Sequence, residues 1–198
     1  MSDYFVHPTA LVESDNVGDG TQIWAFSHVL KGGTIGKQCS IADHCFVESG
    51  AVIGDYVTIK NGNMIWTGVT LEEGVFVGPS ATFTNDRYPR SSRLPELQLE
   101  DGGVRDWLVP TVVRRGATIG ADSILIAGIE IGEFAMVGAG ATVTRDVKPY
   151  SLVIGSPAHH YQWVCRCGLP LNIDGTQAVC DFCQRQYVEN GGRLSMQE

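Results

Sequence analysis

The segment Ile35–Phe83, IGKQCSIADHCFVESGAVIGDYVTIKNGNMIWTGVTLEEGVFVGPSATF, decides the fold because an apolar residue stands at every sixth position. Neither an α-helix nor an ordinary alternating strand produces a six-residue step. A repeat of fixed period is typical of a solenoid. The step extends back to Phe5 and returns after an interruption. The twenty apolar positions are Phe5, Leu11, Val17, Ile23, Val29, Ile35, Ile41, Val47, Ile53, Ile59, Ile65, Leu71, Val77, Phe83, Val113, Ile119, Leu125, Ile131, Val137 and Val143.

The repeat predicts an all-β triangular prism in which each hexapeptide forms one short strand and one corner. The apolar residue points inward, and a small residue two positions earlier, such as Cys39, Cys45 or Ala51, fills the core beside it. Gly, Asp and Asn suit the turns, where φ is often positive. Three hexapeptides close one coil, and stacked coils pair as parallel strands about 4.8 Å apart. Each coil therefore packs only against its neighbours.

The repeat loses its phase between Phe83 and Val113, which predicts an insertion loop over residues 84–112. Long loops in compact proteins are uncommon and more often functional than accidental. This loop begins with TNDRYPRS, which carries Asp86, Arg87, Tyr88 and Arg90. A solvated loop with weak local ion pairs is the alternative interpretation.

Four of the six cysteines lie close together near the end of the chain. Cys165 and Cys167 form a C-x-C pair, Cys180 and Cys183 form a C-x-x-C pair, and NIDGTQ between them indicates a turn. Four thiolates on two turns suit tetrahedral zinc, and a closed four-sulfur site is structural. We therefore expect a zinc-ribbon-like appendage over residues 159–189, with two disulfides or free thiols as alternatives, and a flexible tail over 190–198.

Composition and net charge limit the binding partners and the cellular compartment that we expect. The net charge is −8 and the pI is about 5.0, which disfavours nucleic acid and anionic membranes as partners. No stretch approaches the ~20 apolar residues of a membrane helix. The N-terminal residues MSDYFVHPTA lack the features of a signal peptide, so we expect a cytoplasmic protein with reduced thiols or a bound metal.

The repeat over residues 5–158 resembles the hexapeptide-repeat acyltransferase superfamily, which implies a left-handed parallel β-helix and a homotrimer. Three segments narrow the resemblance: TQIWAFSH (21–28), VTIKNGNMI (57–65) and GVFVGPSATFTNDRYPRS (74–91). They are similar to nucleotide-sugar N-acetyltransferases of lipopolysaccharide and S-layer glycan pathways. The segment 113–158, which ends in SLVIGSPA, resembles the coenzyme A groove of the superfamily.

The resemblance implies transfer of an acetyl group from acetyl-CoA to an amine of a nucleotide-linked amino sugar. The acceptor would be the 3- or 4-amino group of a dTDP- or UDP-linked deoxysugar. Such a transfer requires a neutral amine close to the carbonyl, donors for the oxyanion and a route for the departing proton. Asn85, at the start of the insertion, is expected to accept from the amine, with Asp86 beside it. His28 is the candidate base because imidazole titrates near neutral pH.

The same resemblance implies the other binding residues. Asn61, Arg87, Tyr88, Arg90 and Trp24 are expected to contact the substrate. The cofactor residues are the backbone of Ala127 and Gly128 at the thioester, Arg114, Arg115, Arg145 and Lys148 at the phosphates, and Gly155 and Pro157 shaping the groove. His28 raises a geometric question, because residues eighteen apart stack and His28 would lie three coils below residue 82, about 14 Å along the axis. It could instead contact the nucleotide or an adjacent subunit.

Three other functions are weighed against acetyl transfer to a sugar. A carbonic anhydrase of the same fold needs three converging histidines, and the helical region holds only His7, His28 and His44, which do not stack. A non-catalytic scaffold would not need the insertion or the SLVIGSPA turn. Acylation of a non-nucleotide acceptor, such as an amino acid or an antibiotic hydroxyl, is the third alternative.

Overall fold

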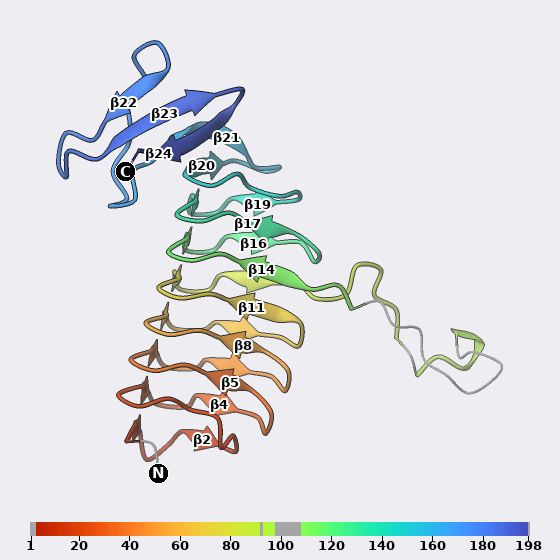
Figure 1. The fold of residues 1–198 in the computed structure, drawn as a ribbon. Coiled ribbons are helices and arrows are strands. Elements are labelled where there is room, and N and C mark those ends of the chain that lie inside the picture. The colour runs from red at the N-terminus through yellow and green to blue at the C-terminus, as the bar shows by residue number, and fades with distance from the viewer. Residues whose placement is uncertain (1–2, 92, 98–107, 198) are drawn as a thin grey trace.

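The chain forms a parallel β-solenoid with a small antiparallel sheet at its C-terminal end (Figure 1). The computed structural model describes residues 3–91, 93–97 and 108–197. Within these ranges the one helical element is the 3₁₀ helix η1 (Pro95–Leu97), in the insertion. Three sheets form the faces of the solenoid. This agrees with the all-β solenoid that the six-residue step predicts.

Each face is a ladder of short strands. The nine-stranded sheet contains, in order, β1 (Phe5–Val6), β3 (Gln22–Ile23), β6 (Ser40–Ile41), β9 (Thr58–Ile59), β12 (Phe76–Val77), β15 (Thr118–Ile119), β18 (Met136–Val137), β20 (Ser151–Ile154) and β21 (His159–Trp163). The seven-stranded sheet contains β2 (Leu11–Val12), β4 (His28–Val29), β7 (Phe46–Val47), β10 (Met64–Ile65), β13 (Thr82–Phe83), β16 (Ile124–Leu125) and β19 (Thr142–Val143). The five-stranded sheet contains β5 (Thr34–Ile35), β8 (Val52–Ile53), β11 (Val69–Leu71), β14 (Thr111–Val113) and β17 (Glu130–Ile131).

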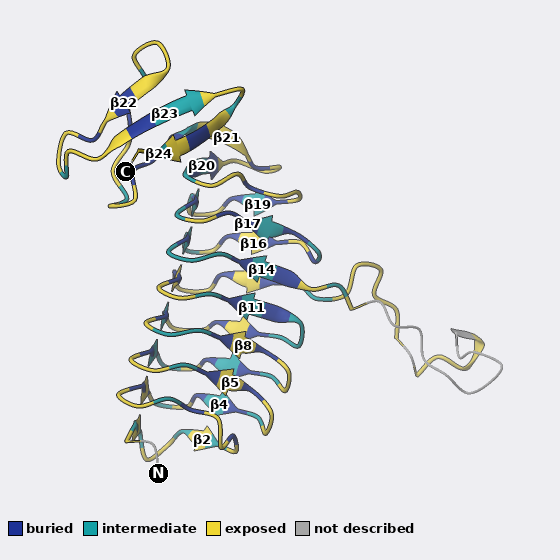
Figure 2. Cartoon of the chain, in the orientation of Figure 1, coloured by how far each residue is buried: buried dark blue, intermediate teal, exposed yellow. Residues whose placement is uncertain are grey.

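The register of the strands stacks residues that are eighteen apart. Val29 pairs with Val47, and Ile41 pairs with Ile59. The predicted inward positions from Val17 to Val143 are at most 3% exposed, and the small residues beside them, including Cys39 and Cys45, are equally buried (Figure 2). Burial raises the pKa of both thiols. These two cysteines are core residues, as the sequence predicts.

The first coil departs from the predicted phase. Phe5 and Leu11 are 46% and 53% exposed, so their assignment to the core is wrong. Val6 pairs with Ile23 and Val12 pairs with Val29, a separation of seventeen residues in each case. The first coil is one residue shorter than the eighteen-residue coils directly above it. A shift of one residue turns a strand's side chains to the opposite face.

The C-terminal sheet consists of β22 (Gln177–Val179), β23 (Gln186–Asn190) and β24 (Arg193–Met196), all antiparallel. The prediction of a flexible tail over 190–198 is therefore wrong for the residues in β24. The turn at Gly191 and Gly192 returns the chain onto β23, and Leu194 enters a second core with Trp163 and Tyr187.

Aromatic rings join the C-terminal sheet to the solenoid. Phe134 stacks on Tyr150 at a centroid distance of 5.7 Å, and Tyr150 meets Tyr187 edge-on at 5.5 Å. The guanidinium of Arg166 lies 4.8 Å from the centroid of Phe134. At the other edge, Lys148 Nζ donates to the carbonyl of Gly192 at 2.6 Å. The C-terminal sheet and the cysteine-containing segment before it, together called the ribbon, are thus attached at two sides of the last coils.

Candidate active site and metal centre

The insertion leaves and returns at the corner between the seven-stranded and five-stranded sheets, here called the insertion corner. Asp86 forms an antiparallel bridge with Leu108, and Val109 N donates to Asn85 O at 2.8 Å. The described part of the insertion extends away from the solenoid as an arm (Figure 1). Part of the predicted loop, residues 92 and 98–107, lies outside the described residues. Asn85 and Asp86 therefore sit at the root of the arm.

A hydrogen bond orients the Asn85 side chain. Its Nδ2 donates to the backbone carbonyl of Thr67, one coil below, at 3.2 Å. An amide whose nitrogen is fixed in this way presents its oxygen as an acceptor. Asn85 is half-buried, so Oδ1 can be reached by a ligand at this corner. The acceptor role expected for Asn85 stays a prediction.

The next coil contributes two backbone amides to the same corner. Ala127 N donates to Thr84 Oγ1 at 2.9 Å, and Gly128 N donates to Thr111 Oγ1 at 3.1 Å. Both N–H groups that the resemblance assigns to the thioester are thus bonded to hydroxyls. Gly128 has a φ of +85°, and a Cβ there would lie 2.9 Å from Cγ1 of Val109. Glycine at this position allows the returning arm to pack against the coil.

The other residues of TNDRYPRS are exposed on the arm. The guanidinium of Arg87 lies 6.0 Å from the ring centroid of Tyr88, and a Cβ at Gly128 would lie 3.9 Å from Nη1 of Arg87. Among the described residues, Arg90 Nη1 donates only to the carbonyl of Pro89. Arg87 is therefore near the corner, whereas Arg90 makes a local contact.

His28 is far from Asn85 within one chain. On the seven-stranded sheet it stacks below Phe46, Met64 and Thr82 in turn, which places it three coils away, about 14 Å along the axis. Its Nε2 is buried and has no hydrogen bond among the described residues, and Glu13 Oε2 lies 3.7 Å away.

Two further predicted substrate residues lie at another corner. Trp24 and Asn61 sit between the nine-stranded and seven-stranded sheets, in coils below the insertion. Trp24 is 39% exposed and packs against Phe5 at a centroid distance of 5.4 Å. A single chain therefore does not bring Trp24, His28 and Asn61 together with Asn85.

Two of the cationic residues assigned to coenzyme A phosphates are engaged elsewhere. Arg114 follows β14 and forms ion pairs with Glu72 and Glu130, and Arg115 pairs with Glu73 at 3.3 Å. The Arg114 guanidinium lowers the pKa of Glu130. Both arginines lie at the corner between the five-stranded and nine-stranded sheets, away from Asn85. Their contacts indicate a structural role.

A cavity of about 440 Å³ lies between the last coil and the ribbon. Its floor is formed by core valines of the last coil, and Arg145, Lys148, His160 and Trp163 line its sides. Within the described ranges no ion pair or hydrogen bond is recorded for the Arg145 guanidinium. Burial, with a smaller contribution from the Lys148 ammonium, lowers the pKa of His160, whose Nδ1 lies 2.7 Å from Ser151 Oγ.

The turn after β20 closes one side of the last coil. Gly155 has a φ of +95°, and its carbonyl accepts from Thr142 N at 2.9 Å. The Ser156–Pro157 peptide bond is cis, and Ala158 N donates to Thr142 O at 2.7 Å. Gly155 and Pro157 thus belong to a tight backbone turn, and their place in a coenzyme A groove stays a prediction.

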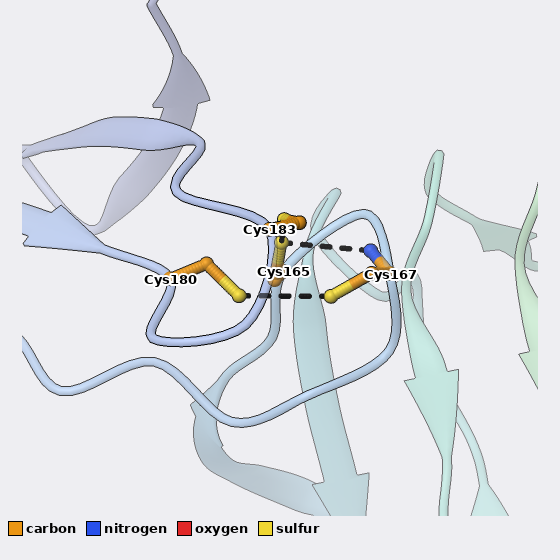
Figure 3. A group of neighbouring side chains, drawn as sticks. All are labelled: Cys165, Cys167, Cys180 and Cys183. Carbon is orange, nitrogen blue, oxygen red and sulfur yellow. Dashed lines mark hydrogen bonds between the residues drawn. The ribbon is translucent and has the colours of Figure 1, made fainter.

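The four cysteines of the ribbon form one cluster (Figure 3). All four Sγ atoms lie within 4.8 Å of one another, with 3.3 Å between Cys165 and Cys183 and 3.6 Å between Cys167 and Cys180. A tetrahedral zinc site with bonds of ~2.3 Å places its sulfurs about 3.8 Å apart. The cluster therefore fits a zinc ion, and Cys165 and Cys180 are buried in the ribbon core.

Comparisons with known proteins identify the family. No family model matches the chain. A relative from Aneurinibacillus thermoaerophilus, dTDP-3-amino-3,6-dideoxy-α-D-galactopyranose 3-N-acetyltransferase, is 46% identical over 191 residues, which cover 96% of this chain and 94% of the relative. The chain belongs to the nucleotide-linked amino-sugar N-acetyltransferases. The chain is therefore an N-acetyltransferase.

Two solved structures share the fold of this N-acetyltransferase. The N-acyltransferase AntD from Bacillus cereus, as a variant in complex with dTDP and coenzyme A, has a TM-score of 0.54 at 16% identity and covers 84% of this chain and 85% of its own. A GDP-perosamine N-acetyltransferase variant from Caulobacter crescentus, in complex with CoA and GDP-perosamine, has a TM-score of 0.53 at 20% identity and covers 81% of this chain and 57% of its own. Among the described residues, no helix is long and apolar enough to span a bilayer.

Three threonines of the insertion corner were not predicted from the sequence. The Thr67 backbone carbonyl accepts from the Asn85 side-chain amide, and the Thr84 and Thr111 hydroxyls accept from the two backbone amides of the next coil. The eighteen-residue spacing between Thr67 and Asn85 could have identified the first of them. The contact of Thr84 with Ala127 could not be found in this way, because the insertion lies between them and separates them by 43 residues.

Proposed function

We propose that the N-acetyltransferase uses acetyl-CoA to acetylate the 3-amino group of a dTDP-linked 3-amino-3,6-dideoxyhexose, in surface glycan biosynthesis. The observation that carries this proposal is the 46% identity over nearly the whole length of a relative with that named activity. The alternatives within the family are a UDP-linked sugar and a 4-amino group.

The insertion corner is the proposed reaction site. Asn85 Oδ1 accepts from the sugar amine and directs its lone pair towards the thioester carbonyl, while Nδ2 stays on Thr67. Asp86 holds the root of the arm through its bridge to Leu108. The amine attacks the carbonyl carbon, the C–S bond breaks, and the departing thiolate takes the proton released by nitrogen. A protein base is then unnecessary.

The remaining substrate residues are proposed to come from a neighbouring copy in a homotrimer. Trp24, His28 and Asn61 lie in lower coils and on the other edge of the seven-stranded sheet. That sheet exposes the apolar side chains of Leu11, Met64 and Ile124, and Ile126 follows directly after β16. Each of the four is 37–53% exposed. Exposed apolar surface of this kind favours burial against another copy. His28 and Asn61 would then contact the nucleotide, with Arg87, Tyr88 and Arg90 closing over the sugar.

Coenzyme A is proposed to extend from the insertion corner towards the C-terminal end. Ala127 and Arg145 stack above Asn85 at this corner, which places Arg145 about 10 Å further along the axis. Arg145 and Lys148 then meet the phosphates beside the cavity, and Gly155 and Pro157 shape its wall. Ala127 and Gly128 face the thioester with their N–H groups shared with Thr84 and Thr111. Arg114 and Arg115 do not contact coenzyme A in this proposal, because their ion pairs with glutamates join neighbouring coils of the solenoid.

Three structural features complete the proposal. The coils wind left-handed, as in the hexapeptide-repeat superfamily. Cys165, Cys167, Cys180 and Cys183 hold a zinc ion, which cross-links the two turns of the ribbon and supplies no catalytic chemistry because all four positions are filled. The enzyme acts in the cytoplasm, where thiols stay reduced and nucleotide sugars are made.

Release of thiol from acetyl-CoA tests the function. The enzyme is incubated with dTDP- and UDP-linked 3-amino and 4-amino deoxysugars, and fastest release is expected with the dTDP-linked 3-amino sugar. Faster release with another sugar corrects the acceptor. If coenzyme A binds but no sugar reacts, the acceptor lies outside nucleotide sugars. Failure to bind coenzyme A would favour a non-catalytic scaffold.

A further inference from the structure

Three side chains at the insertion corner make the same contact in successive coils. Ser49 Oγ donates to the carbonyl of Lys31, Thr67 Oγ1 to that of Ser49 at 2.6 Å, and Asn85 Nδ2 to that of Thr67 at 3.2 Å. Each donor is eighteen residues after its acceptor. Asn85 is the last step of this ladder. It differs from the two hydroxyl residues because its amide keeps an acceptor oxygen for a ligand.

A carboxylate fixes the step directly below Asn85. Glu48 Oε2 accepts from Thr67 N at 2.8 Å and lies 2.9 Å from Thr67 Oγ1. Hydrogen bonds to an ionised acceptor are shorter and stronger than neutral ones. Thr67 belongs to the turn that ends at Gly68, whose φ is +84° and whose carbonyl accepts from Thr111 N at 3.1 Å. Glu48 therefore holds the turn that carries the acceptor of Asn85.

We propose that Glu48 is a positioning residue that acts through Thr67 to keep the Asn85 amide in the orientation used for acetyl transfer. Glu48 lies two coils below Asn85, and among the described residues its carboxylate is linked to Asn85 through Thr67. Without its carboxylate, Thr67 loses the acceptor of its N–H group, and the turn can rotate. The Thr67 carbonyl then moves relative to Asn85 Nδ2, and small displacements of a positioning group are costly in turnover.

This inference rests on the proposed function, because the Asn85 orientation matters only where Asn85 contacts the amine. Substitution Glu48→Ala is expected to lower kcat about tenfold, the effect of losing one charge-assisted hydrogen bond. The KM for acetyl-CoA should stay within about twofold, because the cofactor runs in the opposite direction along the axis. Glu48→Gln keeps an acceptor oxygen for Thr67 N and should restore most of kcat. Glu48→Asp replaces Glu48→Ala if the latter does not fold.

Ser49→Ala is the matched control. It removes the ladder contact to Lys31 but leaves the Ser49 carbonyl, Glu48 and Thr67 in place, so kcat should equal that of the wild type. Thermal unfolding of both variants separates loss of stability from loss of turnover. A Glu48→Ala enzyme with wild-type kcat overturns the proposal. So does a Ser49→Ala enzyme that loses as much kcat as Glu48→Ala.

A double-mutant cycle tests the route through Asn85. If Glu48 acts through Asn85, Glu48→Ala should have almost no further effect on kcat in an Asn85→Ala background. An equal fall in both backgrounds overturns the route. Absence of transfer by the wild-type enzyme to every nucleotide-linked amino sugar would overturn the proposed function and this inference with it. An active wild type with independent Glu48 and Asn85 effects overturns this inference alone.

Discussion

His28 and Asn85 are separated by three coils of the solenoid, although the resemblance assigns both to one reaction. His28 stacks below Phe46, Met64 and Thr82, and Asn85 follows the last of these strands. A base must come within hydrogen-bonding reach of the proton that it removes. His28 of the same chain does not satisfy this condition for an amine held at Asn85.

We therefore expect His28→Gln to raise the KM for the nucleotide sugar while kcat changes by less than about threefold, because uniform binding is lost without transition-state binding. Steady-state kinetics with the sugar varied at saturating acetyl-CoA measure both constants. A fall of about a hundredfold in kcat, together with loss of the acidic limb of the pH profile, would instead identify His28 of a neighbouring copy as the base.

Asn85→Ala is expected to lower turnover at least about tenfold, because the sugar amine loses the acceptor that orients it. The variant should remain folded and keep the wild-type oligomeric state, since the lost contact to Thr67 is a single hydrogen bond at a half-buried position. Asn16→Ala, in the first coils and far from the insertion corner, is the control. A wild-type rate for Asn85→Ala would remove this residue from the mechanism.

The period of six specifies most of the solenoid because each inward position is set by local alternation and by the coil directly below. It fails at Phe5 and Leu11, since a coil shortened by one residue moves the inward position to Val6 and Val12, and nothing in the repeat marks the shortening. The flexible tail is wrong for a different reason: β24 gains its stability from burying Leu194 beside Tyr187, a tertiary contact.

The candidate site also contains residues whose position the sequence predicts and residues whose contacts it does not. The position of Asn85 follows from the interruption of the repeat, which is visible in the sequence. The engagement of Arg114 with Glu72 and Glu130 does not, because these acids are 42 and 16 residues away and only the folded register brings them together. Their charge alone could not show that Arg114 is paired with glutamates, whereas Arg145 lies beside the cavity.

Gly128→Ala should destabilise the enzyme more than Gly74→Ala. Both glycines have positive φ, +85° and +68°, so each substitution costs about 1–2 kcal/mol of backbone strain. At Gly74 a Cβ meets nothing within 4 Å, whereas at Gly128 it lies 2.9 Å from Cγ1 of Val109. Thermal unfolding of the two variants compares them directly. Equal melting temperatures would show that the arm moves to accommodate the added methyl group without loss of stability.

The pH dependence of stability should contain a contribution from His160. Burial lowers its pKa in the folded protein, so between that value and about 6.5 the unfolded chain binds a proton that the folded chain does not. Stability is therefore lost as pH falls through about 6.5. His160→Asn, which can keep the bond to Ser151, should show a smaller decrease in melting temperature between pH about 7.5 and about 5.5. Identical decreases would mean that His160 is protonated equally in both states.

The ribbon should contain about one zinc ion per chain, measured by elemental analysis of protein purified without added metal. Cys180→Ser is expected to lower this content strongly, because Cys180 is buried and its Sγ lies 3.6 Å from that of Cys167. Cys45→Ala, in the solenoid core and outside the cluster, is the matched control and should keep the metal. Removal of zinc by a chelator should release the ribbon wall of the cavity and raise the KM for acetyl-CoA more than that for the sugar. A metal-free protein that remains stably folded would refute the zinc site.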